Sequence, residues 1–536
     1  MEKNLLMLGE SNARGNQDIY GYDQKDNMYH NCFFELYQDT NFGKIGYVIK
    51  RPGVSSTVSA QPSDAVANSC YGVGCFTAQD FSNYNIYFAV FYTGDLKYHF
   101  YHFNPVTTVV TKIGSSSSYY SLDTIYRVKF TNIGLPDDSI NMAMVFNDGI
   151  TYVKGASIIL QASPALGAPW SVGNKLTSAI YLNNRVFVGD TYTGQIWQSS
   201  LGGYATFSAS EFISVESYGG RLVELGRYNN YIVAFKEYST EFFEDVGNEN
   251  GSVLTRVGSA VQQLGCTHPS TVVDTGGGEL IWLATDEQQK HKVVKLNNSF
   301  NVEEIQDQAL DKYLNLVATY DKSYAYLLNT NGHQFYVLTL CQKLLGTPSS
   351  TDLTNVTFVY DLKTKLWTQW YTHGVGTIPV VGGAQRRTLG SFRYSSSCTN
   401  TFNTNYVQSI DNGKLYQIDD FYGADFNGPI NFSVQISNLT FGTMKRKFLN
   451  SVTIVTDIST YNTASESIRL EFSNKDEYVT FSRYLNANRD SFNEFVARAF
   501  GQFRRGTLRL TYQGTLPMRI TAINVDFDIG EGYAIS

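Results

Sequence analysis

The chain has 536 residues, and 43% of them are hydrophobic, which supplies enough apolar side chain for a large core and excludes global disorder. It contains 38 tyrosines, 34 phenylalanines and 45 glycines but only 17% charged residues, a composition that favours short strands and tight turns, so we predict an all-β protein. The net charge of −7 argues against a dedicated nucleic-acid-binding protein, which normally presents a basic face to phosphates.

The cysteines and the first residues indicate where the protein is made. The six cysteines show neither disulfide nor metal-ligand spacing and are compatible with a reducing cytoplasm. The apolar stretch ending at Leu8 is too short for a signal peptide, and the apolar runs of the chain are too short for a transmembrane helix. We therefore expect synthesis in the cytoplasm without export by a standard signal.

Residues 1–52 are polar and rich in turn-forming residues. The strand candidates in this segment are Phe33-Phe34 and Gly46-Tyr-Val-Ile49. We interpret residues 1–52 as an N-terminal arm that packs on another part of the molecule and ends at Lys50-Arg-Pro-Gly53.

A repeated pattern of turn, strand, turn and strand follows over residues 53–426. Asn-Gly, Asp-Gly and Asn-Asn turns precede short apolar strands, and such turns favour the positive φ angles of tight hairpins. The turns at 147, 183, 229 and 276 are spaced by 36, 46 and 47 residues, the size of a four-stranded propeller blade. We predict a β-propeller of about six blades, with one more or fewer, and rim insertions at about 104–145, 341–356 and 380–410. The alternative is a set of unrelated β-sandwiches, which the regular spacing disfavours.

One helix is expected, over Val302–Leu314. A helix there places Ile305, Leu310 and Tyr313 on one face, with acidic residues in its first turn. We interpret it as a helix that packs between blades.

Residues 427–536 have a different pattern, in which apolar and polar residues alternate, as in Ile523, Val525 and Phe527. This period of two is typical of sheets with one solvated face, so we predict a separate C-terminal β-sandwich. The segment has a charge of +2, against −9 for residues 1–426. Its basic residues form two clusters that are either solvated loops or a docking surface for an acidic partner: Lys445, Arg446 and Lys447, and Arg504 and Arg505.

The sequence contains no strong catalytic motif, and we predict no catalytic residue, no cofactor and no metal site. His99 and His102 are three apart in a strand candidate, a spacing that suits two ordinary histidines better than a metal. Cys266 and His268 share a face without further ligands nearby, which favours a buried thiol. The segment Asp361–Trp367 differs in spacing from the Asp-box of sialidase propellers, so we interpret it as a hairpin whose tryptophan packs between blades.

Several segments carry a resemblance to a known family. They are Glu241-Phe-Phe-Glu-Asp-Val-Gly-Asn248, Arg256-Val-Gly-Ser-Ala260, Leu264-Gly-Cys-Thr-His-Pro-Ser270, Ile281-Trp-Leu283, Lys50-Arg-Pro-Gly53, Asp311-Lys-Tyr-Leu314, Lys447-Phe-Leu449, and Gly501–Leu510 with Ile523–Phe527. In this order they resemble the packaged-DNA-stabilisation proteins, or tail-hub (nozzle) proteins, of short-tailed bacteriophages.

The resemblance implies a structural protein of the virion, assembled in the host cytoplasm. Six copies would form a ring below the portal and its adaptor, extend the channel for double-stranded DNA, retain the packaged genome, conduct it during ejection and anchor tail fibres, tailspikes or a needle. A heterologous ring needs one repeated interface per subunit, and an acidic wall would repel phosphate. The alternative function is a carbohydrate-binding or glycoside-hydrolysing propeller of the virion, which would require two carboxylates about 5–10 Å apart in a concave pocket.

Overall fold

The computed structural model describes most of the chain. The described residues are 2–4, 28–39, 43–63, 70–78, 85–116, 127–133, 140–248, 251–297, 299–314, 317–320, 322–344, 353–372, 377–378, 386–387, 391–400, 403–425, 428–458, 467–474, 481–486 and 494–530.

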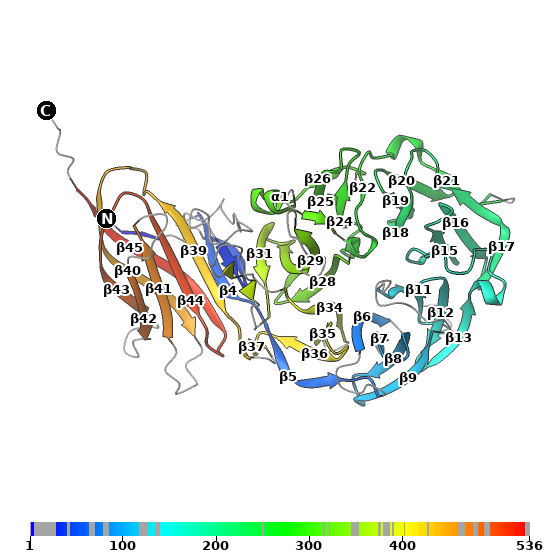
Figure 1. Cartoon of the computed structure of the whole chain (residues 1–536), viewed down its shortest axis with the longest axis horizontal. Helices are drawn as coiled ribbons and strands as arrows, with labels where there is room; N and C mark the ends of the chain where they lie inside the picture. Colours follow the sequence, from blue (N-terminus) through cyan, green and yellow to red (C-terminus); the bar gives the residue numbers. More distant parts are fainter. Residues whose placement is uncertain are drawn as a thin grey trace.

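The described residues build seven β-sheet units of about four strands each, arranged in a ring as the blades of a propeller, with a sandwich of long strands beside it (Figure 1). The all-β fold class with a propeller is therefore confirmed, and the blade number lies at the upper end of the predicted range. The first strand of each blade lies nearest the axis, and the fourth lies at the periphery.

The blades follow one another in the sequence. Blade one contains β6 (Cys70–Ala78), β7 (Asn85–Tyr92), β8 (Lys97–Asn104) and β9 (Val109–Ser115); blade two β10 (Lys129–Asn132), β11 (Met142–Phe146), β12 (Gly149–Lys154) and β13 (Ser157–Ala162); blade three β14 (Ile180–Leu182), β15 (Arg185–Asp190), β16 (Gln195–Ser200) and β17 (Gly203–Ser214); blade four β18 (Leu222–Tyr228), β19 (Tyr231–Lys236), β20 (Thr240–Asp245) and β21 (Leu254–Arg256). Blade five contains β22 (Gly265–Cys266), β23 (Val273–Asp274), β24 (Leu280–Thr285), β25 (His291–Leu296) and β26 (Val302–Glu304); blade six β28 (Tyr324–Thr330), β29 (His333–Leu344), β30 (Leu353–Asp361) and β31 (Leu366–Trp370), with β27 (Val317–Thr319) paired to β29; blade seven β34 (Tyr394–Thr399), β35 (Asn405–Ser409), β36 (Leu415–Asp419) and β5 (Gly53–Ala60).

Blade seven closes the ring because it combines strands from both ends of the propeller sequence. Its outer strand β5 precedes blade one in the chain, and it pairs antiparallel with β36, which comes more than 350 residues later. Backbone hydrogen bonds between the first and last strands therefore hold the ring shut. Closure also removes two sheet edges that would otherwise invite pairing with other chains.

The continuous apolar run in β19 shows why the blades stack. Successive strand side chains point to opposite faces, so Ile232 and Ala234 pack in a cluster with strands of blade three, whereas Val233 and Phe235 pack with Trp282 of blade five. All of these side chains are fully buried. A blade covered on both faces needs apolar residues at every position, as in parallel sheets.

The predicted hairpin turns adopt the conformations that their sequences favour. Asn147, Asn183, Asn229 and Asn331 have φ between 47° and 57°, and each lies in a turn between two strands of one blade. Asparagine tolerates this left-handed region better than most residues, because its short side chain bonds the local backbone. The spacing of these turns therefore reported the blade period correctly.

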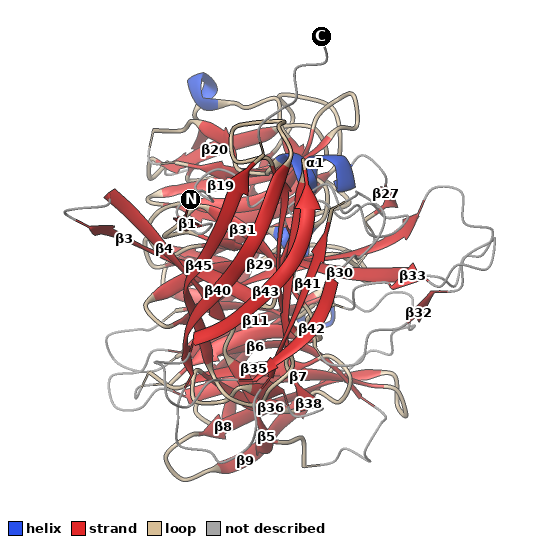
Figure 2. Ribbon diagram, turned by 90° about the vertical axis from the view of Figure 1, so that its left-hand side faces the viewer, coloured by secondary structure: helices blue, strands red, loops and turns tan. Residues whose placement is uncertain are grey.

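The strands outside the propeller form two sheets that face each other across one hydrophobic core (Figure 2). They are β1 (Glu2–Asn4), β2 (Met28–His30), β3 (Cys32–Asp39), β4 (Gly43–Lys50), β39 (Phe432–Leu439), β40 (Lys447–Ile458), β41 (Ser467–Ser473), β42 (Phe481–Asn486), β43 (Glu494–Phe503), β44 (Gly506–Tyr512) and β45 (Met518–Ile529). Short hairpins are β32 (Thr377–Ile378) with β33 (Arg386–Arg387), and β37 (Ala424–Asp425) with β38 (Gly428–Pro429).

The sandwich is not separate from the rest of the chain, which corrects one expectation. Strands β1, β3 and β4 of the N-terminal segment lie in the same sheet as β45 and β40, and Phe34 and Val48 belong to the sandwich core. Strand β2 pairs with β39 on one side and parallel with β31 of blade six on the other, so one ten-stranded sheet runs from blade into sandwich. Sequence periodicity does not report such pairings, because they join residues hundreds of positions apart.

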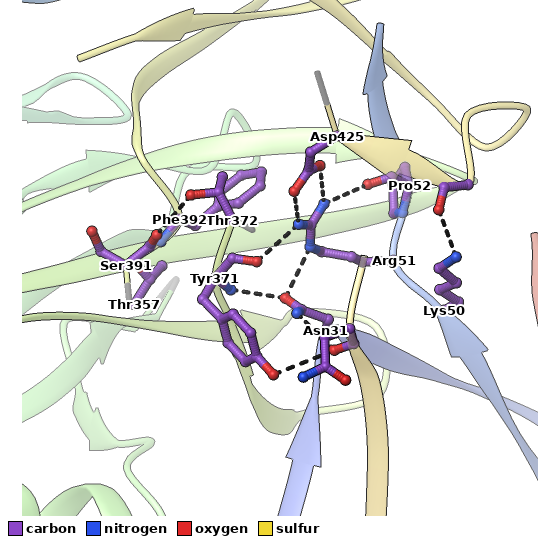
Figure 3. A network of polar contacts seen from close by, with 12 residues as sticks. Asn31, Lys50, Arg51, Pro52, Thr357, Tyr371, Thr372, Ser391, Phe392 and Asp425 are labelled. Atoms are coloured by element: carbon purple, nitrogen blue, oxygen red, sulfur yellow. Dashed lines mark hydrogen bonds and ion pairs between the residues drawn. The ribbon is translucent and has the colours of Figure 1, made fainter. Parts of the chain in front are cut away.

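The link between arm and propeller is a buried polar network at Arg51 (Figure 3). Its guanidinium makes a bidentate ion pair with Asp425 at 2.9 and 2.5 Å, and both side chains are fully buried. The remaining N–H groups bond the Asn31 Oδ1 at 3.0 Å and the carbonyls of Pro52 and Tyr371 at 2.9 Å each. All five guanidinium donors therefore have acceptors, which is what a buried arginine requires.

The neighbouring Lys50 makes a second junction. Its ammonium donates to the carbonyls of Gly423, Gly514 and Leu516 at 2.5, 2.7 and 3.1 Å, so all three N–H groups are used. Gly423 admits no side chain, since a Cβ there would lie 2.0 Å from the Thr515 carbonyl oxygen. The Lys50-Arg51 pair thus connects the sandwich loop at 514–516 with the end of the propeller sequence at 423–425.

The three predicted rim insertions also need correction. The range 104–145 holds β9, β10 and most of β11, and the ranges 341–356 and 380–410 hold parts of β29, β30, β34 and β35, so these ranges are largely blade. Residues 117–126, 134–139, 345–352, 379–385 and 388–390 of these ranges lie outside the described residues.

The expected helix begins later than predicted, as α1 (Gln308–Leu314), because Val302–Glu304 pairs with β25 as the outer strand of blade five. Tyr313 and Leu314 of α1 pack in the cluster between blades five and six, as the helical pattern predicted. The other helical segments are the short 3₁₀ turns η2 (Pro164–Leu166), η3 (Gly258–Ala260) and η4 (Pro269–Thr271). No helix in the described ranges has both the length and the apolar character to span a membrane.

The network predicts a strong dependence of stability on Arg51. Arg51→Met leaves the Asp425 carboxylate buried without a cation, so we expect the free energy of unfolding to fall by about 3–5 kcal/mol. Urea titration monitored by tryptophan fluorescence measures this change. The matched control is Arg393→Met, because the Arg393–Asp411 pair is 55% and 41% exposed and should contribute less than about 1 kcal/mol. Equal midpoint shifts in the two variants would contradict the assigned role of the buried pair.

Candidate functional site

The two predicted basic clusters lie at one end of the sandwich. Lys447 at the start of β40 pairs with Phe503 at the end of β43, and Arg504 and Arg505 form the turn that follows. Lys445, Arg446 and Arg504 are exposed, whereas Arg505 is half-buried. We call Met444, Lys445, Arg446, Phe448 and Arg504 the basic edge; Met444 is 64% and Phe448 39% exposed, so apolar surface accompanies the cations.

Lys447 is not available to a partner, which corrects its assignment as a docking residue. Its side chain is buried, and its ammonium donates to the carbonyls of Thr443 and Lys445 at 2.6 and 2.9 Å. It also lies over the Phe503 ring, and burial lowers the pKa of its amine. Lys447 therefore shapes the loop that presents Lys445 and Arg446. The alternation of β40 contains a signal for this, because Lys447 and Leu449 share the inward face and Phe448 points outward.

A second candidate site is a cavity of about 1020 Å³ on the propeller axis. Its lining comes from the inner edges of all seven blades. The charged side chains among the described lining residues are one carboxylate, Glu237, and four cations, namely Arg127, Lys175, Arg221 and Lys322. This cavity is therefore basic, although the chain as a whole is acidic. Sequence analysis did not identify these residues.

His268 lies in the wall of this axial cavity, two residues after Cys266 in the sequence. Its Nδ1 accepts a hydrogen bond from the Ser270 N–H at 3.3 Å. Burial, with a further contribution from Lys129 and Arg127, lowers the pKa of His268 to about 4, so the ring is neutral at pH 7. The Cys266 thiol is buried and bonds the His268 carbonyl oxygen at 3.3 Å, as expected for a structural cysteine.

His99 and His102 do not form a common site. His99 bonds the Asp95 carboxylate and His102 the Asn85 side chain, each at 2.7 Å. Among the described residues, no group of three or more His, Cys, Asp or Glu side chains is arranged to hold a metal ion.

The hairpin at Asp361 is a structural element of blade six. Asp361 accepts from the Lys363 N–H at 2.9 Å and from the Thr364 hydroxyl at 2.7 Å, and its Oδ2 lies 2.8 Å from Nδ1 of His333. Trp367 packs in the cluster between blades five and six, and its Nε1 donates to the Ile305 carbonyl oxygen. The interpretation of this segment as a hairpin with a packed tryptophan is therefore confirmed.

A smaller cavity of about 400 Å³ lies where arm, propeller and sandwich meet. Glu35, His333, Asp420 and Arg519 are among the residues that line it. Within the described part of the chain, Nε2 of His333 and Oδ1 of Asp420 are buried there without a hydrogen-bond partner. Burial, and secondarily the charge of Asp419, raises the pKa of Asp420 to about 6, while His333 lowers it.

Comparison with known families gives one match. The family described as Bacteriophage P22 Gp10, beta-propeller matches residues 112–373, just under half of the chain. This match confirms that the chain resembles the phage tail stabilisation proteins, and it supports a structural role in a phage virion. No curated protein sequence matches the chain at a significant level.

Solved structures give weak likenesses only. The chain is similar to a streptogramin B lyase (TM-score 0.38, 7% identity, 66% of this chain and 95% of that one), to Kuenenia stuttgartiensis hydrazine synthase (TM-score 0.38, 12% identity, 67% and 98%) and to oligogalacturonate lyase from Vibrio parahaemolyticus (TM-score 0.35, 12% identity, 74% and 98%). No inference about activity follows from them.

The junction cavity predicts a pH-dependent change in stability. Because the pKa of Asp420 is raised in the folded state, folding favours its protonated form, and stability is lost as pH rises from about 4 through about 6. Asp420→Asn should remove this penalty. After allowance for solvent screening, we expect a gain on the order of 1 kcal/mol at pH 7.5 and none at pH 4.

Urea titrations at the two pH values measure this difference. The control is Glu287→Gln on an exposed turn, which should leave the midpoint unchanged at both. If Asp420→Asn instead destabilises the protein at pH 7.5, favourable contacts hold the carboxylate and the assigned penalty is wrong.

Proposed function

We propose that this protein is a ring-forming component of the short tail of a phage, a nozzle that extends the portal–adaptor channel. In this proposal, six copies retain the packaged genome, conduct it during ejection and anchor tail fibres, tailspikes or a needle. The observation that carries the proposal is the family match over residues 112–373. The Lys50–Arg51 network supports it, because it makes propeller and sandwich one stiff unit suited to repeated assembly.

The geometry favours a channel between copies over one through a single propeller. The axial cavity of about 1020 Å³ has the size of a small-ligand site. It does not admit a DNA duplex, whose major groove alone is about 12 Å wide. The expectation of an acidic wall therefore applies to the outer surfaces that face the ring axis, and the basic lining of the axial cavity is no obstacle to DNA passage.

The basic edge is the surface that we assign to an acidic partner. It combines exposed cations with apolar area, and interfaces commonly combine an apolar centre with a polar rim. Its candidate partners are the adaptor or a fibre or needle protein. The runner-up, a glycoside-hydrolysing propeller, needs two carboxylates in one pocket, and the described lining of the axial cavity includes Glu237 as its single carboxylate.

Assembly state tests the ring. We expect the purified full chain, or the chain released from particles, to form a complex of about 360 kDa, six times the 60.0 kDa monomer. Mass photometry over a range of concentrations measures this mass. A stable monomer that cleaves a polysaccharide and is absent from the tail would contradict the proposal and favour the runner-up.

Charge reversal tests the basic edge. In the triple variant Lys445→Glu, Arg446→Glu and Arg504→Glu, like charges would face the acidic partner, so we expect particles assembled with it to lose the partner protein. The control reverses three exposed cations of the propeller, Lys154, Lys290 and Lys363. Quantitative gel analysis of purified particles measures occupancy. Equal occupancy for both triple variants would exclude the basic edge as the docking surface.

A further inference from the structure

The basic residues of the axial cavity recur with the period of the blades. Arg127, Lys175, Arg221, His268 and Lys322 are separated by 48, 46, 47 and 54 residues. Four of them shortly precede the innermost strand of a blade, and His268 lies between the two short inner strands of blade five. Five successive blades therefore present a basic side chain at an equivalent position around one axis.

These residues differ in how firmly they are held. The Arg127 guanidinium stacks 3.6 Å from the centre of the Tyr324 ring and bonds the Ser395 carbonyl oxygen, which fixes its position. Lys175, Arg221 and Lys322 have exposed side chains. The cavity therefore combines one immobilised cation with three solvated ones, which can adjust to a bound group.

The charge balance of the cavity favours an anion. Glu237, the carboxylate among the described lining residues, already accepts the Arg221 backbone N–H at 3.2 Å. A concave site with walls of one sign focuses the field and concentrates ligands of the opposite sign. The low pKa of His268, which the neighbouring cations help to depress, agrees with a positive potential at this wall.

The remaining lining supplies polar and aromatic groups. Asn174, Thr191 and Ser270 line the cavity and offer hydrogen bonds. Tyr192 is 84% exposed and Tyr71 42% exposed, although both line the cavity. Exposed aromatic rings beside cations suit a ligand that has a ring or a chain between its charged groups.

We propose that the axial cavity binds a small ligand with two or more anionic groups, phosphate or carboxylate, held between Lys175, Arg221 and Lys322. The volume of about 1020 Å³ accommodates a molecule of nucleotide or trisaccharide size. This site is independent of the ring, since its lining comes from one chain.

Isothermal titration of the full chain tests the site with three probes. Tripolyphosphate represents a phosphate ligand, trigalacturonate a carboxylate ligand, and maltotriose is the neutral control. We expect binding of tripolyphosphate, trigalacturonate or both, weakening as salt is raised, and no binding of maltotriose. The anionic probe that binds more tightly identifies the source of the charge. Absence of binding by both anions would overturn the proposal.

Variants locate the binding. The triple change Lys175→Gln, Arg221→Gln and Lys322→Gln should weaken binding at least tenfold, because three charge-assisted contacts are lost. The matched control Lys154→Gln, Lys290→Gln and Lys363→Gln should leave the affinity unchanged. All six side chains are exposed, so melting temperatures should be retained. Lys322→Gln by itself, on a turn, gives a second reading, and undiminished affinity in the triple variant would place the anion elsewhere.

Discussion

The buried Arg51–Asp425 ion pair is the contact on which the arrangement of the whole molecule depends. A charged pair removed from water is costly unless every donor is satisfied, and Arg51 meets this condition through groups from the arm, blade six and the end of the propeller sequence. One side chain therefore couples two events that are separate in principle, the closure of the seven-bladed ring and the attachment of the sandwich. Lys50 extends the same junction into the sandwich loop at 514–516.

The consequence for assembly is a rigid building block. Closure by β5 pairs the first strand of the ring with the last blade, and the ten-stranded sheet continues from blade six through β2 into the sandwich. A hinge between propeller and sandwich would have to break buried hydrogen bonds and a shared sheet at once. Such a unit suits a ring in which each copy must present the same surfaces to its neighbours.

Sequence analysis was accurate where the signal was local. Asparagine turns such as Asn183 and Asn229 require positive φ, and their spacing revealed the blades; the apolar run of β19 revealed burial on both faces. It failed where partners lie far apart in the chain. Strand β5 belongs to blade seven, residues 302–304 pair with β25 before the helix begins, and Lys447 is buried against its own loop.

The basic axial cavity was missed for a different reason. Arg127, Lys175, Arg221 and Lys322 recur at the blade period, so a signal was present, but each residue by itself is an ordinary surface cation. Only the ring geometry brings them together. The family-like segments have a related explanation. Glu241 and Arg256, for example, form an ion pair at 2.8 Å with the carboxylate fully buried, so these segments preserve the propeller and carry no catalytic group among the described residues.

Electron cryomicroscopy of the intact particle tests the central claim most directly. The account predicts a ring of six copies in the short tail, into which propeller and sandwich fit together as one rigid unit, with the DNA channel between copies. Density for this chain away from the tail axis, or a fit that requires the sandwich to separate from blade six, would contradict it.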